Sequence, residues 1–388
     1  MQFEIHMASE LIFGGGSRFR TGELALKAGL KKALVITDSF LVDKPVFKEV
    51  VESLAKAGVS AEIFCDISAE PTDTIVYNAA NKLQTSGCDG IVAVGGGSCI
   101  DTAKAVSVFA TNGGKISDFQ GYGKVKKQGL TLIVLPTTAG TGSEVTRVTI
   151  IQDLDRNVKM MCLDNAFMPN IALVDYEMTM SMPPALTSFV GIDALTHAIE
   201  ALVSRKANPI TDLYAEAAIS LISNSLMTVY NTPSDQDARE KMMRASTYAG
   251  IAFSNASVCA VHGMSRPIGA YFHVPHGLSN AFLLPVVMAN SIPGNFAIYA
   301  RVAKAMGVAS ENDSNELAAN KGLARVNELN ALLHIPNMKD YGIPEDKYLN
   351  NLQKMAQDAL DSGSPNNNPR LFTRDELVEI YKEAYYYH

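Results

Sequence analysis

Short apolar runs alternate with longer amphipathic segments as far as Val174, and this alternation constrains the fold more than any other feature of the chain. The apolar runs have the length and composition of buried strands, at residues 31–38, 61–65, 90–95 and 130–135. The segments between them have helical spacing, at residues 46–58, 71–87 and 100–111. Alternation of this kind predicts a mostly parallel sheet that is covered by helices on both faces.

The alternation of strand-like and helix-like segments ends at Asp175. From Pro183 onward the apolar positions follow helical spacing only. Alanine-rich helices are predicted at residues 211–226, 237–253, 296–306 and 315–332. A chain of 388 residues that is 47% apolar is also too long for one ordinary domain. We therefore expect an α/β domain at residues 1–180, followed by an all-α domain at residues 181–388.

Composition excludes several classes of partner. A net charge of −7, with no basic stripe beyond residues 124–127, argues against nucleic acid. No apolar stretch approaches the roughly 18 residues that a membrane span needs, and the start of the sequence has no signal-peptide pattern. The five cysteines form no CxxC motif, which fits reduced thiols in the cytoplasm better than a disulfide framework.

A glycine-rich loop, Gly95-Gly-Gly-Ser98, follows the third predicted strand and leads into a helix. Glycines allow positive φ and let backbone amides approach a pyrophosphate, and the helix N-terminus favours its negative charge. Asp101 has the position of a cap for that helix. A second loop, residues 136–144, also follows a strand and carries hydroxyl groups suited to phosphate and ribose. Together the two loops predict a dinucleotide crevice, although their spacing differs from the G-x-G-x-x-G fingerprint.

Asp38 ends the first predicted strand, and its carboxylate has two interpretations. It can accept hydrogen bonds from the adenosine ribose and repel a 2′-phosphate, which favours NAD over NADP. The same carboxylate can instead cap a helix.

Four potential metal ligands lie on two short segments beyond residue 190. Asp193 and His197 are four residues apart in a predicted helix, so both side chains lie on one helical face. His262 and His276 lie at the two ends of the second segment. A lone histidine of this kind is more often a core residue than a ligand. One carboxylate and three imidazoles nevertheless form a complete shell for Fe²⁺ or Zn²⁺.

These motifs resemble the iron-containing alcohol dehydrogenase family, whose members include lactaldehyde reductase and 1,3-propanediol dehydrogenase. The resemblance runs from the Phe13–Gly16 segment, which looks like a hairpin, to the C-terminal helices. The pattern Gly-Gly-Gly-Ser98-x-x-Asp101-x-x-Lys104 and residues 136–144 look like the family's two cofactor loops. The implied fold is a Rossmann-like NAD-binding domain followed by an α-helical metal-binding and catalytic domain, as in dehydroquinate synthase-like proteins.

The resemblance also implies a function and a set of site residues. The metal, Fe²⁺ in preference to Zn²⁺, is held by Asp193, His197, His262 and His276. NAD(H) is contacted by Asp38, Gly96, Gly97, Ser98, Thr137, Thr138, Thr141, Thr146, Lys159 and Leu186. The implied enzyme is a cytoplasmic, NAD-dependent dehydrogenase of short-chain primary alcohols or diols, which also reduces their aldehydes. Its partners are small molecules and further copies of the chain, in a homodimer or a larger homo-oligomer.

Arg266 departs from the family pattern, because many members have a histidine there that handles protons near the nicotinamide. An arginine stays protonated and cannot act as a general base, so we include it among the catalytic candidates in another role. It either pairs with a buried carboxylate, contacts the cofactor, or selects an anionic semialdehyde such as succinic semialdehyde. His273 can replace the missing histidine or lie at the surface, and Glu70 stands where some members have an asparagine.

Two other functions compete with the dehydrogenase. A dehydroquinate synthase-like lyase needs many lysines and arginines around its substrate, and the metal region here is mostly neutral and apolar. A metal-free binding module would not need the intact ligand quartet. Phe253, Tyr271 and Phe272 are candidates for a short-chain substrate pocket, and each is equally well explained as a core residue.

Overall fold

The computed structural model describes residues 2–67, 70–156 and 158–387. The chain divides into two compact units. One, the α/β unit, spans His6–Ser181, and the other, the helical unit, contains the chain from Met182 onward together with the short segment that ends at Ile5. The functional roles expected for the two domains, NAD binding for the first and metal binding for the second, remain predictions.

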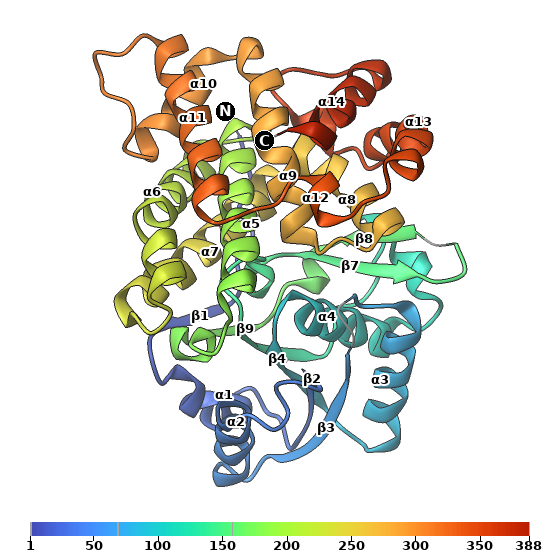
Figure 1. Ribbon diagram of the computed structural model, residues 1–388. Coiled ribbons are helices and arrows are strands. Elements are labelled where there is room, and N and C mark those ends of the chain that lie inside the picture. The colour runs from blue at the N-terminus through green and yellow to red at the C-terminus, as the bar shows by residue number, and fades with distance from the viewer. Residues whose placement is uncertain (1, 68–69, 157, 388) are drawn as a thin grey trace. The chain divides into compact units, whose positions relative to one another are not determined.

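A six-stranded sheet forms the centre of the α/β unit, and all of its strands are parallel (Figure 1). The strands are β1 (Glu10–Phe13), β2 (Lys32–Asp38), β3 (Ser60–Ile67), β4 (Gly90–Gly95), β6 (Thr131–Pro136) and β9 (Ile171–Val174). They are arranged in the order β1-β9-β6-β4-β2-β3. All six residues of β4 are buried, as expected for a strand whose two faces are both covered. The predicted parallel sheet is therefore confirmed.

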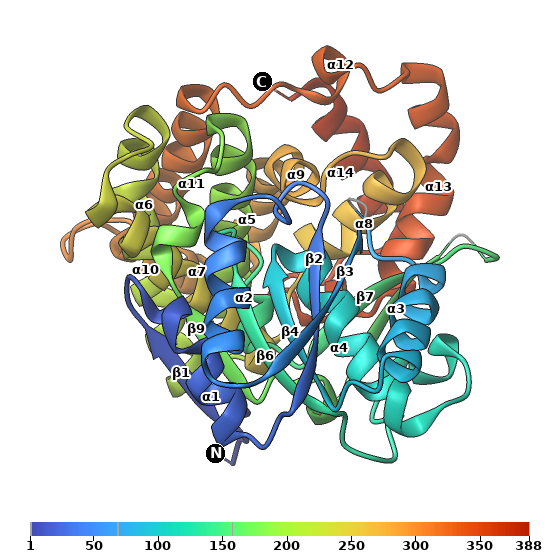
Figure 2. The same ribbon diagram turned by 90° about the horizontal axis from the view of Figure 1, so that it is seen from below.

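Helices pack on both faces of this sheet (Figure 2). Helices α1 (Thr21–Lys27) and α2 (Pro45–Lys56) form one hydrophobic core with alternate residues of the strands, among them Val35, Val92 and Ile133. Helices α3 (Asp73–Thr85) and α4 (Gly97–Asn112) pack side by side. Because α4 contacts β4 and β6 but takes no part in that core, it covers the opposite face.

The strand order places a topological switch point between β2 and β4. From β2 the chain moves outward to β3, then crosses back to β4 on the other side of β2. Dinucleotides bind beyond the carboxyl ends of strands at such a point in open α/β sheets. Asp38 ends β2 and Gly95 ends β4, so the two predicted cofactor segments lie at this edge.

Two expectations for the α/β unit are wrong, and one feature of this unit was missed. Residues 13–16 form no hairpin, because β1 pairs in parallel with β9 and the glycines lead into the 3-10 helix Ser17–Arg20. Asp101 does not cap α4, because that helix already begins at Gly97. A small second sheet of β5 (Gly121–Tyr122), β7 (Val148–Asp153) and β8 (Val158–Leu163) was not predicted. Its strands are half-exposed, so they lack the apolar runs that mark buried strands.

The described part of the helical unit is built from α-helices and short 3-10 turns, in agreement with the expected all-α architecture. Its α-helices are α5 (Pro184–Val203), α6 (Pro209–Asn231), α7 (Gln236–Ala256), α8 (Ala260–Phe272), α9 (His276–Ser291), α10 (Phe296–Ala305), α11 (Asn315–Leu332), α12 (Met338–Tyr341), α13 (Glu345–Asp361) and α14 (Arg374–Tyr386). Helix α5 runs through the middle of the unit, packed against α6, α7 and α9 (Figure 1). It is long and apolar enough to span a membrane, but 83% of its most apolar window is buried in the protein, which is typical of a core helix.

Candidate metal centre and cofactor loops

Helix α5 presents Asp193 and His197 on one face, as their spacing predicts. Both side chains are buried, and the Oδ1 atom of Asp193 lies 3.8 Å from Nδ1 of His197. The helix is set close to its neighbour α9 at Gly277, where an added Cβ would lie 2.5 Å from the backbone oxygen of Phe189. A residue larger than glycine at position 277 would therefore push α9 away from α5.

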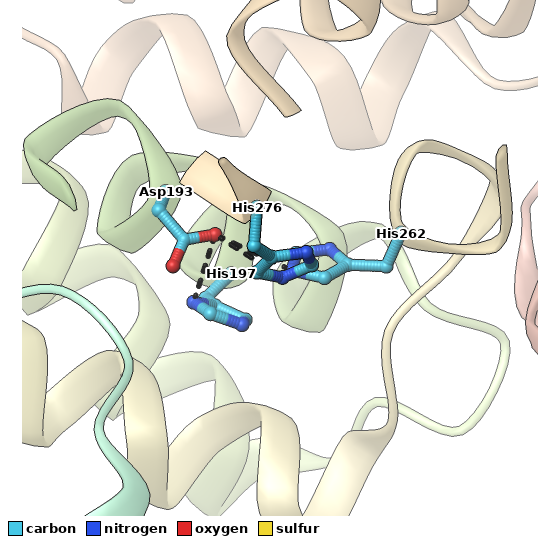
Figure 3. A group of neighbouring side chains, drawn as sticks. All are labelled: Asp193, His197, His262 and His276. Carbon is cyan, nitrogen blue, oxygen red and sulfur yellow. Dashed lines mark ion pairs between the residues drawn. The ribbon is translucent and has the colours of Figure 1, made fainter. Parts of the chain in front are cut away.

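His262 on α8 and His276 at the first position of α9 complete the group. Their Nε2 atoms lie 3.6 and 3.7 Å from Oδ1 of Asp193. Figure 3 shows the three rings gathered around this one oxygen. His262 is buried, whereas the side chain of His276 is 40% exposed, so the group is accessible from the His276 side.

These four residues fit a divalent metal ion. One ligand atom from each lies within 4.8 Å of the others. A tetrahedral ion with bonds of about 2.1 Å separates its ligand atoms by about 3.4 Å, close to the separations observed around Asp193. Burial alone would raise the pKa of Asp193, but the rings of His197, His276 and His262 outweigh it and hold the pKa well below its usual value. The carboxylate is therefore ionised and ready to bind a cation.

Two residues of the helical unit fix the orientation of the histidine rings. Oε2 of Glu200 lies 2.7 Å from Nδ1 of His262, so this nitrogen donates to the carboxylate and Nε2 is left facing Asp193. Phe253 stacks on His197 with ring centroids 4.2 Å apart and an interplanar angle of 16°. Of the three candidates for a substrate pocket, Phe253 is thus the one beside the metal centre.

The two predicted cofactor loops lie against each other in the α/β unit. An added Cβ on Gly97 would lie 2.8 Å from Thr141, and one on Gly96 would lie 3.3 Å from Thr138. Gly96 has a φ of −74°, and neither of its glycine neighbours has a positive φ, so the expectation of positive φ is wrong. The glycines are needed because the backbone of one loop closely approaches the side chains of the other.

The second loop is tied to helix α4 by Lys104, which is fully buried. Its ammonium group donates hydrogen bonds of 2.9 Å to Ser143 Oγ, to Thr146 Oγ1 and to the carbonyl oxygen of Val148. Ser143 Oγ donates in turn to Oδ1 of Asp101 at 2.6 Å. Thr146, predicted to contact the cofactor, therefore has its hydroxyl engaged inside this network.

The other predicted cofactor residues are distributed over several elements. Asp38 accepts hydrogen bonds from the backbone N–H groups of Phe40 and Leu41 through Oδ1, so it caps a turn and not a helix. Its Oδ2 lies 3.8 Å from the thiol of Cys99 in the first turn of α4.

Three further predicted cofactor residues are Ser98 at the start of α4, Thr137 just after β6, and Lys159 on β8, where it pairs with Glu70. Leu186 is exposed in the first turn of α5, in the helical unit.

Comparison with protein families decides the identity of the fold. Residues 8–176 match the family described as "Iron-containing alcohol dehydrogenase". Residues 187–385 match the one described as "Fe-containing alcohol dehydrogenase family, C-terminal". The chain belongs to the iron-containing alcohol dehydrogenase family. The expected family, fold class and oxidoreductase activity are thereby confirmed.

Relatives of this dehydrogenase family match along almost their whole length. Lactaldehyde reductase of Escherichia coli (strain K12) is 35% identical over 96% of this chain and 97% of its own. The NAD-dependent methanol dehydrogenase of Bacillus methanolicus is 34% identical, with the same coverage. The crystal structure of a 1,3-propanediol oxidoreductase has a TM-score of 0.96 and 33% identity, covering 99% of this chain and all of the other.

Arg266, the departure from the family's histidine, lies on α8 one turn after His262 and is partly buried. Its Nη1 donates to Ser364 Oγ at 3.1 Å. Burial lowers the pKa of Arg266, while the charge of Glu200 opposes that effect. The charge of the buried Glu200 thus acts on Arg266, which favours the structural account of this arginine. His273 is exposed at the end of α8, with a positive φ of 55°.

Several residues of this dehydrogenase were missed or misjudged from the sequence alone. Glu200 lies seven residues after Asp193 and Asn280 four residues after His276, so helical spacing places each on the same helical face as a predicted ligand but does not show what it contacts. Lys104 belongs to the motif that begins at Gly95, but the motif does not predict its hydrogen bonds to Ser143 and Thr146. Tyr271 and Phe272 pack instead against α13, through Asp358 and Tyr348 respectively, which favours the core explanation for both.

Proposed function

We propose that this chain is a metal-dependent, NAD(H)-linked alcohol dehydrogenase and aldehyde reductase for short-chain primary alcohols or diols. The observation that carries the proposal is the convergence of Asp193, His197, His262 and His276, whose ligand atoms have the spacing of a metal site. The relatives support the substrate class, because their names specify methanol, lactaldehyde and 1,3-propanediol. Fe²⁺ is the preferred ion, and Zn²⁺ suits the same donors.

When bound, the ion supplies a Lewis acid that polarises the alcohol or aldehyde oxygen, and NAD(H) accepts or donates the hydride. The protein's own groups hold and orient both. Asp193 contributes the one negative charge of the ligand set, and Glu200 keeps Nε2 of His262 available for the ion. Phe253 packs against His197 and covers that ring with an apolar surface.

The α/β unit supplies the groups that would bind NAD(H). The N-terminus of α4 would offer backbone N–H groups and a partial positive charge to a pyrophosphate. The Thr137–Thr141 segment adds hydroxyl groups, and Asp38 would accept hydrogen bonds from the ribose. We assign Gly96, Gly97, Ser98, Thr146 and Lys159 to the same cofactor site. Leu186, in the helical unit, remains a predicted cofactor contact.

We also propose that the enzyme works in the cytoplasm as a homodimer or a larger homo-oligomer. The five cysteines support the first point, because none of them forms a disulfide within the described residues. Sedimentation of the purified protein would test the second, since a monomer at micromolar concentration contradicts it.

A second candidate substrate class is an anionic semialdehyde that is recognised by Arg266. The observation in its favour is the position of Arg266, which lies one helical turn after His262 and is not fully buried. A planar guanidinium binds carboxylates bidentately. A panel of short aldehydes, diols and semialdehydes assayed with NADH and added Fe²⁺ tests both proposals. We expect turnover of neutral short-chain aldehydes, and none with any of them would contradict the main proposal.

A further inference from the structure

The chain passes from α7 to α8 through Ser257, whose backbone conformation is unusual. Its φ is 68° and its ψ is 168°. A positive φ is uncommon for any residue with a side chain, and with ψ near 180° the conformation is essentially restricted to glycine. A serine keeps such a conformation only where neighbouring groups hold it, and residues of this kind cluster at functional sites.

Asn367 is one of the groups that hold Ser257, although it lies more than a hundred residues further along the chain. Asn367 is buried at the end of the 3-10 helix Ser364–Asn367. Its Nδ2 donates hydrogen bonds of 3.0 Å to Ser257 Oγ and to the carbonyl oxygen of Val258. An amide nitrogen has two hydrogens, so both are used on this junction. On the α7 side, the backbone N–H of Ser257 donates to the carbonyl oxygen of Phe253 at 2.7 Å.

The same junction is tied to the end of α5. The backbone N–H of Arg205, just beyond α5, donates to the carbonyl oxygen of Asn367 at 2.8 Å. Ser204 Oγ donates to the carbonyl oxygen of Ala256, the last residue of α7, at 2.6 Å. Asn367 therefore connects the helix that carries two of the predicted metal ligands to the start of the helix that carries a third.

The 3-10 helix also meets α8 directly beside His262. An added Cβ on Gly263 would lie 2.7 Å from Cδ of Pro365, so the two segments are in close contact there. His262 is the third residue of α8 and follows Ser257 by only five positions. A change of direction at Ser257 would therefore move the first turn of α8, and the imidazole with it.

We propose that Asn367 is a positioning residue of the metal centre, which holds Ser257 in its glycine-like conformation and so directs His262 toward Asp193. This inference rests on the metal site of the proposed function. Asn367 acts through the backbone, because its side chain donates to Ser257 and Val258 and not to a ligand. The competing explanation is that Asn367 stabilises the fold as a whole without any selective effect on the metal centre.

Replacing the amide by a carboxylate of nearly equal size tests the proposal. In Asn367→Asp an oxygen replaces the donor and repels the carbonyl oxygen of Val258. Asn366→Asp makes the same chemical change at the neighbouring exposed position and is the matched control. We expect Asn367→Asp to bind Fe²⁺ or Co²⁺ roughly 10- to 100-fold more weakly than the wild type in competition with a chelator. The control should bind as the wild type does, and equal affinities of the two variants overturn the proposal.

Ser257→Gly separates positioning from general stability, because glycine adopts a positive φ without the steric cost of a side chain. In the wild type, where Asn367 already holds this backbone, we expect Ser257→Gly to leave metal affinity unchanged. Added to Asn367→Asp, it should raise metal affinity at least about fivefold, and a double-mutant cycle measures the difference. If Ser257→Gly has the same effect in both backgrounds, Asn367 does not act through Ser257 and the proposal is overturned.

A crystal structure of the wild type is the further measurement, and it does not depend on how the variants fold. A positive φ at Ser257, with Nδ2 of Asn367 in contact with it, supports the proposal. A negative φ at Ser257 overturns it, because no strained conformation would then need to be held. A wild type that binds no metal at the quartet would instead refute the proposed function itself.

Discussion

The carboxylate of Glu200 holds the ring of His262 through a contact of 2.7 Å between Oε2 and Nδ1. Oε1 of the same carboxylate accepts a hydrogen bond of 2.6 Å from the backbone N–H of Val261, which fixes Glu200 in turn. A histidine with Nδ1 committed to a carboxylate presents Nε2 to a metal and becomes a stronger ligand. The candidate metal centre therefore extends beyond Asp193 and the three histidines to a residue one turn further along α5.

Replacing this carboxylate by an amide of the same shape tests that relationship. We expect Glu200→Gln to lower metal affinity roughly 10- to 100-fold, because a neutral partner orients and polarises the imidazole less strongly. Chelator competition on purified protein measures the change. Glu240→Gln is the matched control, since Glu240 pairs with Arg244 on the partly exposed face of α7. Equal affinities of the two variants would show that Glu200 does not support the site.

Asp38 is expected to set the preference for NADH over NADPH, and the structure indicates the variants to use. Oδ1 accepts from the backbone of Phe40 and Leu41, so Asp38→Gly disturbs the turn as well as the charge. Asp38→Asn keeps that acceptor and removes only the charge. We expect NADPH use to rise in both, by about one to two orders of magnitude for a charge-assisted contact worth roughly 1.5–3 kcal/mol. The measurement is kcat/KM with each cofactor, and a wild type that already prefers NADPH would refute the role of Asp38.

Lys104 is expected to hold the second cofactor loop in place. Replacing it by methionine removes the three hydrogen bonds to Ser143, Thr146 and Val148. We expect Lys104→Met to raise the KM for NADH at least tenfold, while the KM for the aldehyde changes much less. Lys354→Met, at an exposed position on α13, is the control and should change neither constant. An unaltered KM for NADH would count against this role of Lys104.

Burial lowers the pKa of Lys104 to about 8, against the opposing charges of Asp101 and Glu144. In the unfolded chain the group keeps its proton up to the ordinary pKa of 10.5. Between these values the unfolded state binds more protons than the folded state, so stability rises with pH. Relative to Lys104→Met, the wild type should therefore gain stability from about pH 8 to pH 10, as denaturant titrations can measure. A difference that falls over this range would contradict the assignment.

Arg266 is expected to matter for substrate choice only if its guanidinium group meets the substrate. In that case Arg266→His should remove a preference for succinic semialdehyde over butanal of at least tenfold, about 1.4 kcal/mol. Activity on butanal should be kept or improved. If the wild type uses the two aldehydes equally well, Arg266 does not select the substrate. Its hydrogen bond to Ser364 and the nearby charge of Glu200 then favour the structural account.

The features that could be predicted from the sequence are those carried by local patterns. The buried strands β2 and β4 are short apolar runs, and the spacing of Asp193 and His197 places both on one helical face. The strands β7 and β8 were missed because they are half-exposed and have no such runs. Asp101 was misplaced because the start of a helix depends on backbone geometry that glycines leave open.

The contacts around the ligands required the three-dimensional structure. Glu200 and Asn280 have suitable helical spacing, but spacing does not show which of several polar residues on a face meets a histidine from another helix. The role of Lys104 depends on its distance to Ser143 and Thr146, which lie about forty residues further along the chain. Long-range relations of this kind leave no periodic signal in a single sequence.

The central measurement is a titration of Fe²⁺ into chelator-treated enzyme under anaerobic conditions, with bound metal and NADH-linked aldehyde reduction followed in the same samples. We expect activity to be absent without metal, to rise in proportion to bound ion, and to level off at one ion per chain. His262→Ala, folded and still able to bind NADH, should remain inactive throughout the titration. Full activity of the wild type in a preparation shown to contain no metal would contradict the metal-dependent function.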